Sequence, residues 1–349
     1  MLYSNRNHCC GGHYYIDPCG CRVGPTGPTG PTGPAGGGAD YTNTEPDNAR
    51  AYTVNQCTGA IDIWNGATGK SLGSIPLASS PLEITINQTT KLAYVTESDG
   101  SLQVIDLRTN QIVATLPNNY GTRPAVNENT NTVYVADAGS PVLNVINGAD
   151  NSVVTQIPLS DIPAAIAVDP TLNRIFVAEP GANAIQVIDG NTNQVIQTIP
   201  VPNAPLRIAV NPNTHMVYVV SENPNGASSS NEELLTTING STGFILNRQP
   251  FPGDNQGGDI AVDTVNNQVM IATDLGSGST YLFDGDGNLI RQITTTNNDG
   301  YDTGAAVNPE TGNTYQVDPQ SGLSIYNKNG DKVQTIPSPC ADGVDVTNL

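Results

Sequence analysis

From about Ala49 onward, short runs of alternating apolar and polar residues follow one another, with Asn, Asp and Gly between them. Such runs predict short β-strands joined by tight turns. One feature marks the repeat, because a large apolar residue begins a strand at Tyr52, Tyr94, Tyr134, Phe176, Tyr218, Met270 and Tyr315. The steps between these residues are 42, 40, 42, 42, 52 and 45 positions. A period of this size indicates a solenoid or a propeller.

Three further strands complete each unit. A small apolar strand ending in Asn or Asp precedes the large apolar residue, as at Val168 and Asp169. A third strand follows it, as at 187–189, and a fourth closes the unit, as at 195–200. Four strands per unit are typical of a propeller blade, so residues 49–349 predict an all-β, seven-bladed β-propeller.

The first unit lacks its innermost strand, and the missing strand is found at the other end of the chain. Residues 340–347 have the innermost-strand pattern and follow the last strand of the seventh unit. We therefore expect the C-terminal strand to pair beside Tyr52 and to close the ring, which leaves no open sheet edge there. Aligned on the fourth blade, Cys57 and Cys340 face each other across this pair, which predicts a disulfide. The alternative is two buried free thiols.

The repeat resembles that of the YVTN-repeat β-propeller family. The similar residues are Tyr94, Val95 and Thr96, followed by strands at 104–106 and 113–117. Phe176, Val177 and Ala178, with the strands that follow them, are similar too. The resemblance covers about residues 50–349 and is strongest in blades two to four. It implies the same propeller fold.

Charge limits the choice of partner. The chain carries a net charge of -19, with 13 Lys and Arg against 32 Asp and Glu, and no basic run. Such a surface repels phosphate, so neither nucleic acid nor anionic membrane is expected as a partner. No stretch is apolar enough to insert into a membrane. The first residues also lack the apolar core of a secretory signal peptide.

The N-terminal part divides into three segments. Residues 1–23 hold Cys9, Cys10, Cys19 and Cys21 but few residues that could form a core. Disulfide cross-linking between chains fits them better than zinc, because their spacing is not that of a usual zinc site, although His8 and His13 lie nearby. Residues 24–36 repeat Gly-Pro-Thr, which predicts either a collagen-like trimer or a stiff spacer. Residues 37–48 are expected to be a linker.

A Cys-rich head, Gly-Pro-Thr triplets and a globular C-terminal domain together resemble the collagen-like surface proteins of bacterial endospores. The resemblance covers residues 1–36. It implies an anchored N-terminus, an outward-facing propeller and synthesis in the mother cell, with an extracellular, spore-surface location reached without a secretory signal. By the same resemblance, Thr26, Thr29 and Thr32 are candidate glycosylation sites. Other spore-surface proteins or further copies of the chain are then the expected partners, linked through N-terminal disulfides.

No catalytic site is evident in the propeller. Its one histidine, His215, falls in a turn, where a solvated residue is more common than a catalytic base, and no spacing indicates a Ser, His and Asp set. Residues 284–288 resemble the start of a calcium loop but lack its later Glu, so a hairpin turn is the simpler interpretation. We therefore expect no enzymatic activity.

An acidic residue recurs at one position of the repeat. Six blades place an acid just after the large apolar strand, and blade one has Asn55 there; the acids are Glu97, Asp137, Glu179, Glu222, Asp274 and Asp318. These strand ends are expected on one rim of the propeller. They are either solvated charges or a site for a divalent cation such as Ca²⁺ or for a basic partner. The insertion between Glu222 and Glu233 is expected to project from the same rim as a contact loop.

Three functions follow as hypotheses. The first is a non-enzymatic structural or adhesive surface protein that is cross-linked through its N-terminal cysteines into a spore surface or filament. The second is a binding module that uses the acidic rim. The third is an enzyme of the lactonase-like propeller class, which His215 alone would have to support.

Overall fold

The computed structural model describes residues 46, 48–117, 120–121, 123–137, 139–222, 232–252, 259–273, 279–294, 304–318, 322–338 and 340–349. Contacts divide the chain into two compact units, residues 1–42 and 43–349, and the described residues all lie in the second. Within them, no helix is long and apolar enough to cross a membrane.

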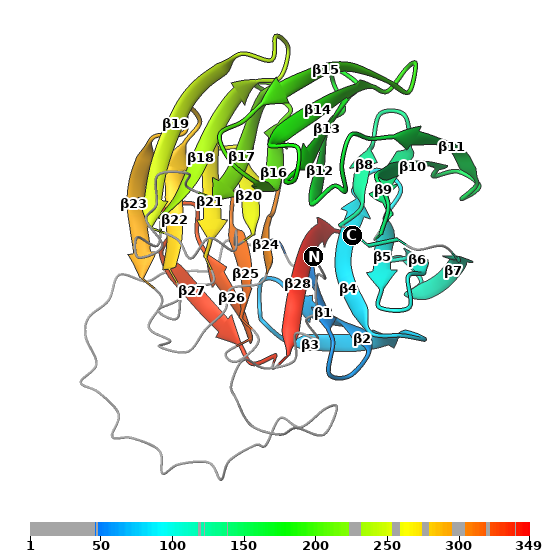
Figure 1. Ribbon diagram of the computed structural model, residues 1–349. Helices are drawn as coiled ribbons and strands as arrows, with labels where there is room; N and C mark the ends of the chain where they lie inside the picture. Colours follow the sequence, from blue (N-terminus) through cyan, green and yellow to red (C-terminus); the bar gives the residue numbers. More distant parts are fainter. Residues whose placement is uncertain are drawn as a thin grey trace, which may run out of the picture. The chain divides into compact units, whose positions relative to one another are not determined.

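The second unit is a ring of seven four-stranded antiparallel sheets, as the repeat predicts (Figure 1). Strands are given from the innermost outward. Blade 1 contains β28 (Ala341–Asn348), β1 (Ala49–Asn55), β2 (Ala60–Asn65) and β3 (Ser71–Pro76). Blade 2 contains β4 (Pro81–Asn87), β5 (Leu92–Glu97), β6 (Leu102–Asp106) and β7 (Gln111–Leu116). Blade 3 contains β8 (Ala125–Asn127), β9 (Thr132–Ala136), β10 (Val142–Asn147) and β11 (Val153–Pro158). Blade 4 contains β12 (Ala165–Asp169), β13 (Arg174–Glu179), β14 (Ala184–Asp189) and β15 (Gln194–Pro200).

The remaining three blades follow the same order. Blade 5 contains β16 (Pro205–Asn211), β17 (Met216–Glu222), β18 (Glu232–Asn239) and β19 (Ile245–Pro252). Blade 6 contains β20 (Ile260–Asp263), β21 (Gln268–Ala272), β22 (Ser279–Asp284) and β23 (Leu289–Thr294). Blade 7 contains β24 (Gly304–Val307), β25 (Thr314–Asp318), β26 (Gly322–Tyr326) and β27 (Lys332–Ile336).

The hydrophobic core lies between neighbouring sheets. One cluster joins Tyr52 and Ile61 of blade 1 to Ile84 and Val95 of blade 2, and similar clusters join other neighbouring blades around the ring. The large apolar residues that mark the repeat are buried within these layers. Each blade therefore depends on its neighbours for burial of its faces, which is why the period of the sequence extends over the whole ring.

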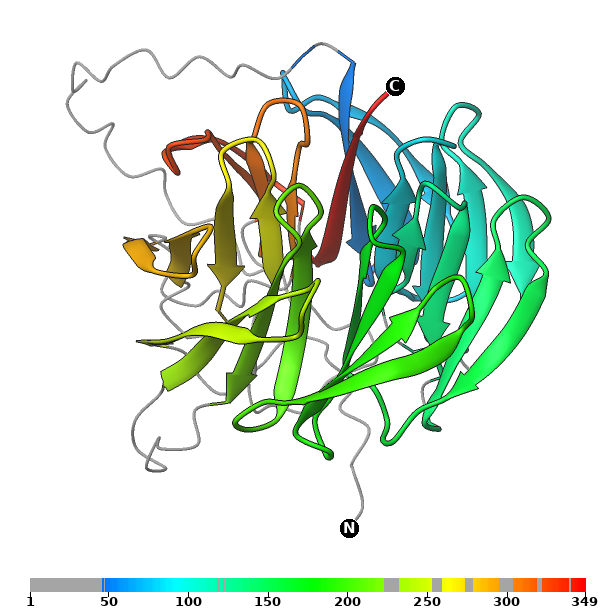
Figure 2. The ribbon, with the colours of Figure 1, turned by 90° about the horizontal axis from the view of Figure 1, so that it is seen from above.

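The C-terminal strand closes the ring, as predicted. β28 pairs antiparallel with β1, from Ala49 opposite Asn348 to Asn55 opposite Ala341. Figure 2 shows β28, in dark red, beside the blue strands of blade 1. At the Asn348 end, the amide of Asn48 donates to the carbonyl of Leu349 at 3.0 Å. This seam therefore has a hydrogen-bonded connection where the two ends of the propeller sequence meet.

Every blade has a β-bulge at the same place, where its outermost strand pairs with the strand inside it. In blade 4, for example, Ile188 pairs with Val195 and Val187 pairs with Gln197, so Ile196 is the extra residue. The extra residues are Leu72, Val113, Val154, Ile196, Leu246, Ile290 and Val333. A repeated bulge of this kind re-aims side chains on the outer edge of each blade.

Candidate functional site

One end of the axial channel is ringed by a single position from each blade. This position lies four residues before a recurrent polar residue at or beside the end of the innermost strand, such as Asn87 in blade 2 or Asn127 in blade 3. Its occupants, in blade order, are Gly343, Glu83, Arg123, Ala165, Arg207, Asp259 and Gly304. The innermost strands run the same way around the ring, so these residues meet at one mouth of the channel. The ring thus holds two cations and two acids among small residues.

Arg123 crosses this mouth. Its Nη1 lies 3.0 Å from Oδ2 of Asp259 in blade 6, and its Nε lies 3.6 Å from Oε2 of Glu83 in blade 2. Its Nη2 donates to the carbonyl of Val344 in blade 1 at 3.0 Å. Burial alone would lower the pKa of Arg123, but the carboxylates of Asp259, Glu83 and Asp345 raise it above its usual value. One permanent cation therefore links four blades at the axis.

Two carboxylates near the axis, those of Asp345 and Asp259, accept hydrogen bonds from backbone N–H groups. The inner edge of each innermost strand has no strand partner, so its N–H groups need other acceptors. Asp345 accepts from the N–H of Ile86 at 2.7 Å and from that of Val346 at 2.8 Å. Asp259 accepts from the N–H of Ala305 at 2.7 Å. Burial raises the pKa of Asp345 to about 6, although Arg123 and these hydrogen bonds act to lower it.

The recurrent acids that the structure describes do not come together at one site. Glu97 is fully buried and accepts from the N–H of Ser79, the hydroxyl of Ser101 and the amide of Gln103. The bond from Ser79 fastens the loop that leads into β4, and the other two hold Glu97 against the start of β6. Glu97 therefore belongs neither to a solvated rim nor to an open cation site.

Three more of these acids are placed in loops or at strand ends. Glu179 is also buried and accepts from the N–H of Ser160, and burial raises its pKa. Asp137 accepts from the N–H of Gly139, while Glu222 ends β17 half-buried. Asp274 lies outside the described residues, and of Asp318 only the backbone, at the end of β25, is described. Among the described residues, no three acidic, His or Cys side chains are placed to hold a metal.

His215 has a partner within the fold. Its Nδ1 lies 2.7 Å from Oδ2 of Asp169, a fully buried carboxylate that ends the innermost strand of blade 4. His215 itself has a left-handed backbone with φ of 59°. It is thus more than the solvated turn residue that the sequence suggests, because it joins blade 5 to blade 4.

This pair is one member of a set that we call the inter-blade clasps. Each joins the polar end of one innermost strand to the left-handed residue in the first hairpin of the next blade. The other side-chain pairs of this form are Asn87 with Asn131, Asn127 with Asn173, and Asn211 with Asn267. Lys91, also left-handed, donates to Thr347 at 3.0 Å across the closing seam. His215 thus takes a position that Asn fills elsewhere, in a structural contact.

The segment that resembles a calcium loop is a hairpin turn. The Oδ1 atom of Asp284 accepts from the N–H groups of Asp286 at 3.0 Å and Asn288 at 2.8 Å. Side chains of Asp bind their own turn in this way in many hairpins. The Asp284 carboxylate is therefore used within the turn.

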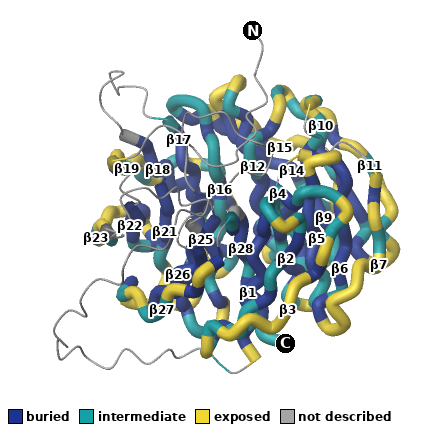
Figure 3. Tube along the Cα trace, turned by 90° about the horizontal axis from the view of Figure 1, so that it is seen from below, coloured by how far each residue is buried: buried dark blue, intermediate teal, exposed yellow. Residues whose placement is uncertain are grey.

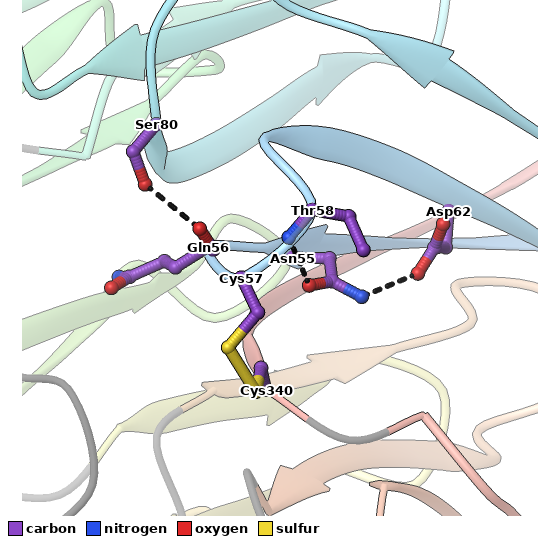
Figure 4. The surroundings of a disulfide bond; sticks show 7 residues. All are labelled: Asn55, Gln56, Cys57, Thr58, Asp62, Ser80 and Cys340. Carbon is purple, nitrogen blue, oxygen red and sulfur yellow. Dashed lines mark hydrogen bonds between the residues drawn. A yellow bond between two sulfur atoms is a disulfide. The ribbon is translucent and has the colours of Figure 1, made fainter. Parts of the chain in front are cut away.

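A disulfide joins Cys57 to Cys340 (Figure 4). Their Cα atoms are 5.7 Å apart, within the usual range for a disulfide. The two cysteines lie just beyond the last pair of the β1–β28 ladder, and the N–H of Gln56 donates to the carbonyl of Cys340 at 3.3 Å. The bond thus secures the closing seam at the end opposite Asn48.

Several predicted sites lie outside the described residues. They are Cys9, Cys10, Cys19 and Cys21, Thr26, Thr29 and Thr32, and the insertion at 223–231. Conversely, the channel cluster of Arg123, Glu83, Asp259 and Asp345 was not predicted. A signal was present, since Arg123 and Arg207 are two of 13 cations in an acidic chain and occupy equivalent places before innermost strands.

No family model matches the chain, and no curated protein matches it in sequence. Solved structures share its fold. A functionally unknown protein from Desulfotomaculum acetoxidans DSM 771 superposes with a TM-score of 0.68 at 15% identity, over 86% of this chain and 99% of that one. Hydrazine synthase from Kuenenia stuttgartiensis gives 0.66 at 15% identity, over 76% and 89%. At such identities, the likeness establishes the propeller fold alone.

Proposed function

We propose that this chain is a non-enzymatic structural or adhesive surface protein that presents a YVTN-type propeller. The observation that carries the proposal is that the ring is fastened at both ends of the β1–β28 seam. The Cys57–Cys340 disulfide holds one end of the β1–β28 seam, and contacts of Asn48 and Lys91 hold the other. A disulfide is typical of oxidising surroundings and of proteins that must persist outside the cell.

The channel supports a structural role for the propeller interior. Arg123 and its carboxylate partners are bonded to one another and to backbone N–H groups. His215 is bound to Asp169 in an inter-blade clasp, away from the mouth where Arg123 lies. These charges stabilise the ring, which favours a protein that functions through its outer surface.

The attachment proposal rests on the N-terminal sequence. Cys9, Cys10, Cys19 and Cys21 would cross-link copies of the chain to one another or to other spore-surface proteins. The collagen-like residues 24–36 would act as a trimeric stalk or as a spacer. An extracellular, spore-surface location follows from the same resemblance.

The test is the state of the full-length protein with and without reductant. We expect disulfide-linked multimers on non-reducing gels, converted to a single chain by reductant. Substitution of Cys9, Cys10, Cys19 and Cys21 by Ser should abolish the multimers, whereas Cys57→Ser with Cys340→Ser should leave them in place. A chain that stays monomeric without reductant contradicts the proposal.

A further inference from the structure

The two arginines at the channel mouth, Arg123 and Arg207, differ in their bonding. Arg123 contacts two carboxylates and a backbone carbonyl of other blades. Arg207 donates only from Nη1, to the carbonyl of Leu206 on its own strand, at 3.1 Å. Within the described part of the chain, no ion pair of Arg207 is found, and its Nε and Nη2 have no acceptor. One of the two cations of the mouth is therefore unpaired.

The strand position of Arg207 is one that directs side chains to the mouth. Glu83 holds this position in blade 2 and reaches Arg123 from it. The register shifts at the same point in both strands, between Pro81 and Glu83 in β4 and between Pro205 and Arg207 in β16. Because the two backbones match there, Arg207 extends from its strand as Glu83 does.

Arg207 is half-buried and thus partly shielded from water. Figure 3 shows its strand, β16, beside β12, in the blue and teal of buried and half-buried residues. Burial of a charge costs free energy unless acceptors replace the lost water. Elsewhere the chain provides them, since the half-buried Arg174 donates to the carbonyls of Gly240 and Ser241 at 2.6 and 2.7 Å. At Arg207 an acceptor from outside the chain would fill this role.

The other charges at the mouth limit which ligand fits. The carboxylates of Asp259 and Asp345 are bonded to Arg123 or to backbone N–H groups, so the unpaired charge is positive. A planar guanidinium binds a carboxylate through two parallel hydrogen bonds. The net charge of -19 opposes anions that carry several charges. A singly charged carboxylate meets both conditions.

Small residues occupy three of the seven positions of the ring. Ala165, which precedes Arg207 around the ring, packs at the edge of the core between blades 4 and 5. Gly304 and Gly343 follow Asp259 in blades 7 and 1. None of the three provides a polar side chain, so these positions suit the short apolar part of an organic acid.

We propose that Arg207 binds the carboxylate of a small, singly charged organic acid at the channel mouth. The acid is either a free molecule or the C-terminal end of a peptide, which present the same group to the guanidinium. This site lies in the propeller and does not depend on cross-linking through the N-terminal cysteines.

The test titrates the full-length protein by isothermal calorimetry at constant ionic strength. The probes are acetate for a free acid, N-acetyl-alanine for a peptide end, and N-acetyl-alanine amide, which lacks the carboxylate. At least one acid should bind with a dissociation constant of about 1 mM or tighter, and the amide should not bind. Arg207→Gln should weaken binding at least about tenfold, because it removes the charge and the planar pair of donors. Arg248→Gln is the matched control, since Arg248 is an exposed cation on an outermost strand.

Binding that is lost in Arg207→Gln and kept in Arg248→Gln supports the proposal, provided that both variants keep the parental melting temperature. N-acetyl-alanine that binds at least about tenfold more tightly than acetate indicates a peptide end, and a smaller difference indicates a free acid. The proposal is overturned if neither acid binds at about 10 mM, tenfold above the expected constant. Equal weakening in the two variants overturns it too, because a general effect of lost positive charge would act on both. Binding of the amide as tight as that of the acid excludes recognition of a carboxylate.

Discussion

The guanidinium of Arg123 in blade 3 lies 3.0 Å from the carboxylate of Asp259 in blade 6, so a single ion pair joins two sheets that are not neighbours in the ring. Asp259 also accepts from the N–H of Ala305 in blade 7. Non-neighbouring blades in a propeller usually influence each other only through the blades between them. Here a direct connection runs across the axis.

Removal of this connection should be costly. Arg123→Ala leaves Asp259 buried without its charge partner, which should lower the free energy of unfolding by about 3 to 5 kcal/mol. Chemical denaturation measures the loss. Arg207→Ala is the control, because Arg207 is half-buried at the equivalent position of blade 5 and no ion pair is found for it among the described residues. Similar losses in the two variants would show that the Asp259 pair is unimportant.

The seam disulfide should contribute strongly to stability. It closes a loop with a sequence separation of 283 residues, and the chain-entropy model assigns about 3 to 5 kcal/mol to long loops of this kind. Cys57→Ser with Cys340→Ser should therefore melt at a clearly lower temperature in calorimetry. Substitution of the four N-terminal cysteines by Ser should leave the melting temperature of the propeller unchanged. If reductant has no effect on melting of the parental protein, the seam does not depend on this bond.

His215 should tolerate Asn but not Ala. Asn fills the equivalent clasp position in blades 3, 4 and 6, and it readily adopts the left-handed backbone. His215→Asn should change stability by less than about 1 kcal/mol. His215→Ala should cost about 2 to 4 kcal/mol, because it strains the backbone and leaves Asp169 without this partner. Equal effects in urea titrations would contradict the clasp.

Asp345 should make stability depend on pH in an unusual direction. Its pKa is about 6 in the folded protein against 3.8 for an ordinary Asp carboxyl, so between these two pH values the folded state binds more protons. Stability from this group is thus largest below about pH 4 and is lost as the pH rises through about 6. The parental protein should lose stability relative to Asp345→Asn between pH 4 and pH 7.

An exposed carboxyl offers the control with the opposite sign. Hydrogen bonds from Ser152 lower the pKa of Asp150. The parental protein should therefore gain stability relative to Asp150→Asn only as the pH rises toward about 4, and the difference between the two should stay level from pH 4 to pH 7. Parallel trends for the two variants would show that burial of Asp345 has no such consequence.

Sequence alone could predict the blades because each one repeats a local pattern. The large apolar residues, the strand-ending Asn or Asp and the turns recur at nearly constant spacing, and short-range alternation determines which residues are buried. Closure by β28 followed from a strand missing at Tyr52 and an extra strand after Ile336. Facing positions for Cys57 and Cys340 followed from the same alignment, although Cys57 lies two residues and Cys340 one residue beyond the last pair of the ladder.

The repeat pattern could not predict the contacts of the channel cluster or the positions of the recurrent acids. Glu97 has the same sequence context whether its carboxylate is exposed on a rim or buried against Ser79, because the loop that covers it comes from an earlier strand connection. Arg123 meets Asp259 only because the ring brings blades 3 and 6 face to face, 136 residues apart along the chain. Such contacts depend on tertiary geometry, which strand periodicity does not encode.

The inter-blade clasps differ from one seam to the next. Asp169, at the end of the innermost strand of blade 4, pairs with His215, whereas the neighbouring seams pair Asn with Asn, and the closing seam uses Lys91. Chains built from near-identical repeats are prone to assemble in the wrong order or with another molecule's repeats. Because Lys91 and Thr347 stand at the closing seam where the other described seams use Asn or His, the junction of blades 1 and 2 has a contact that an interior blade could not reproduce, which distinguishes the two ends of the repeat array during folding.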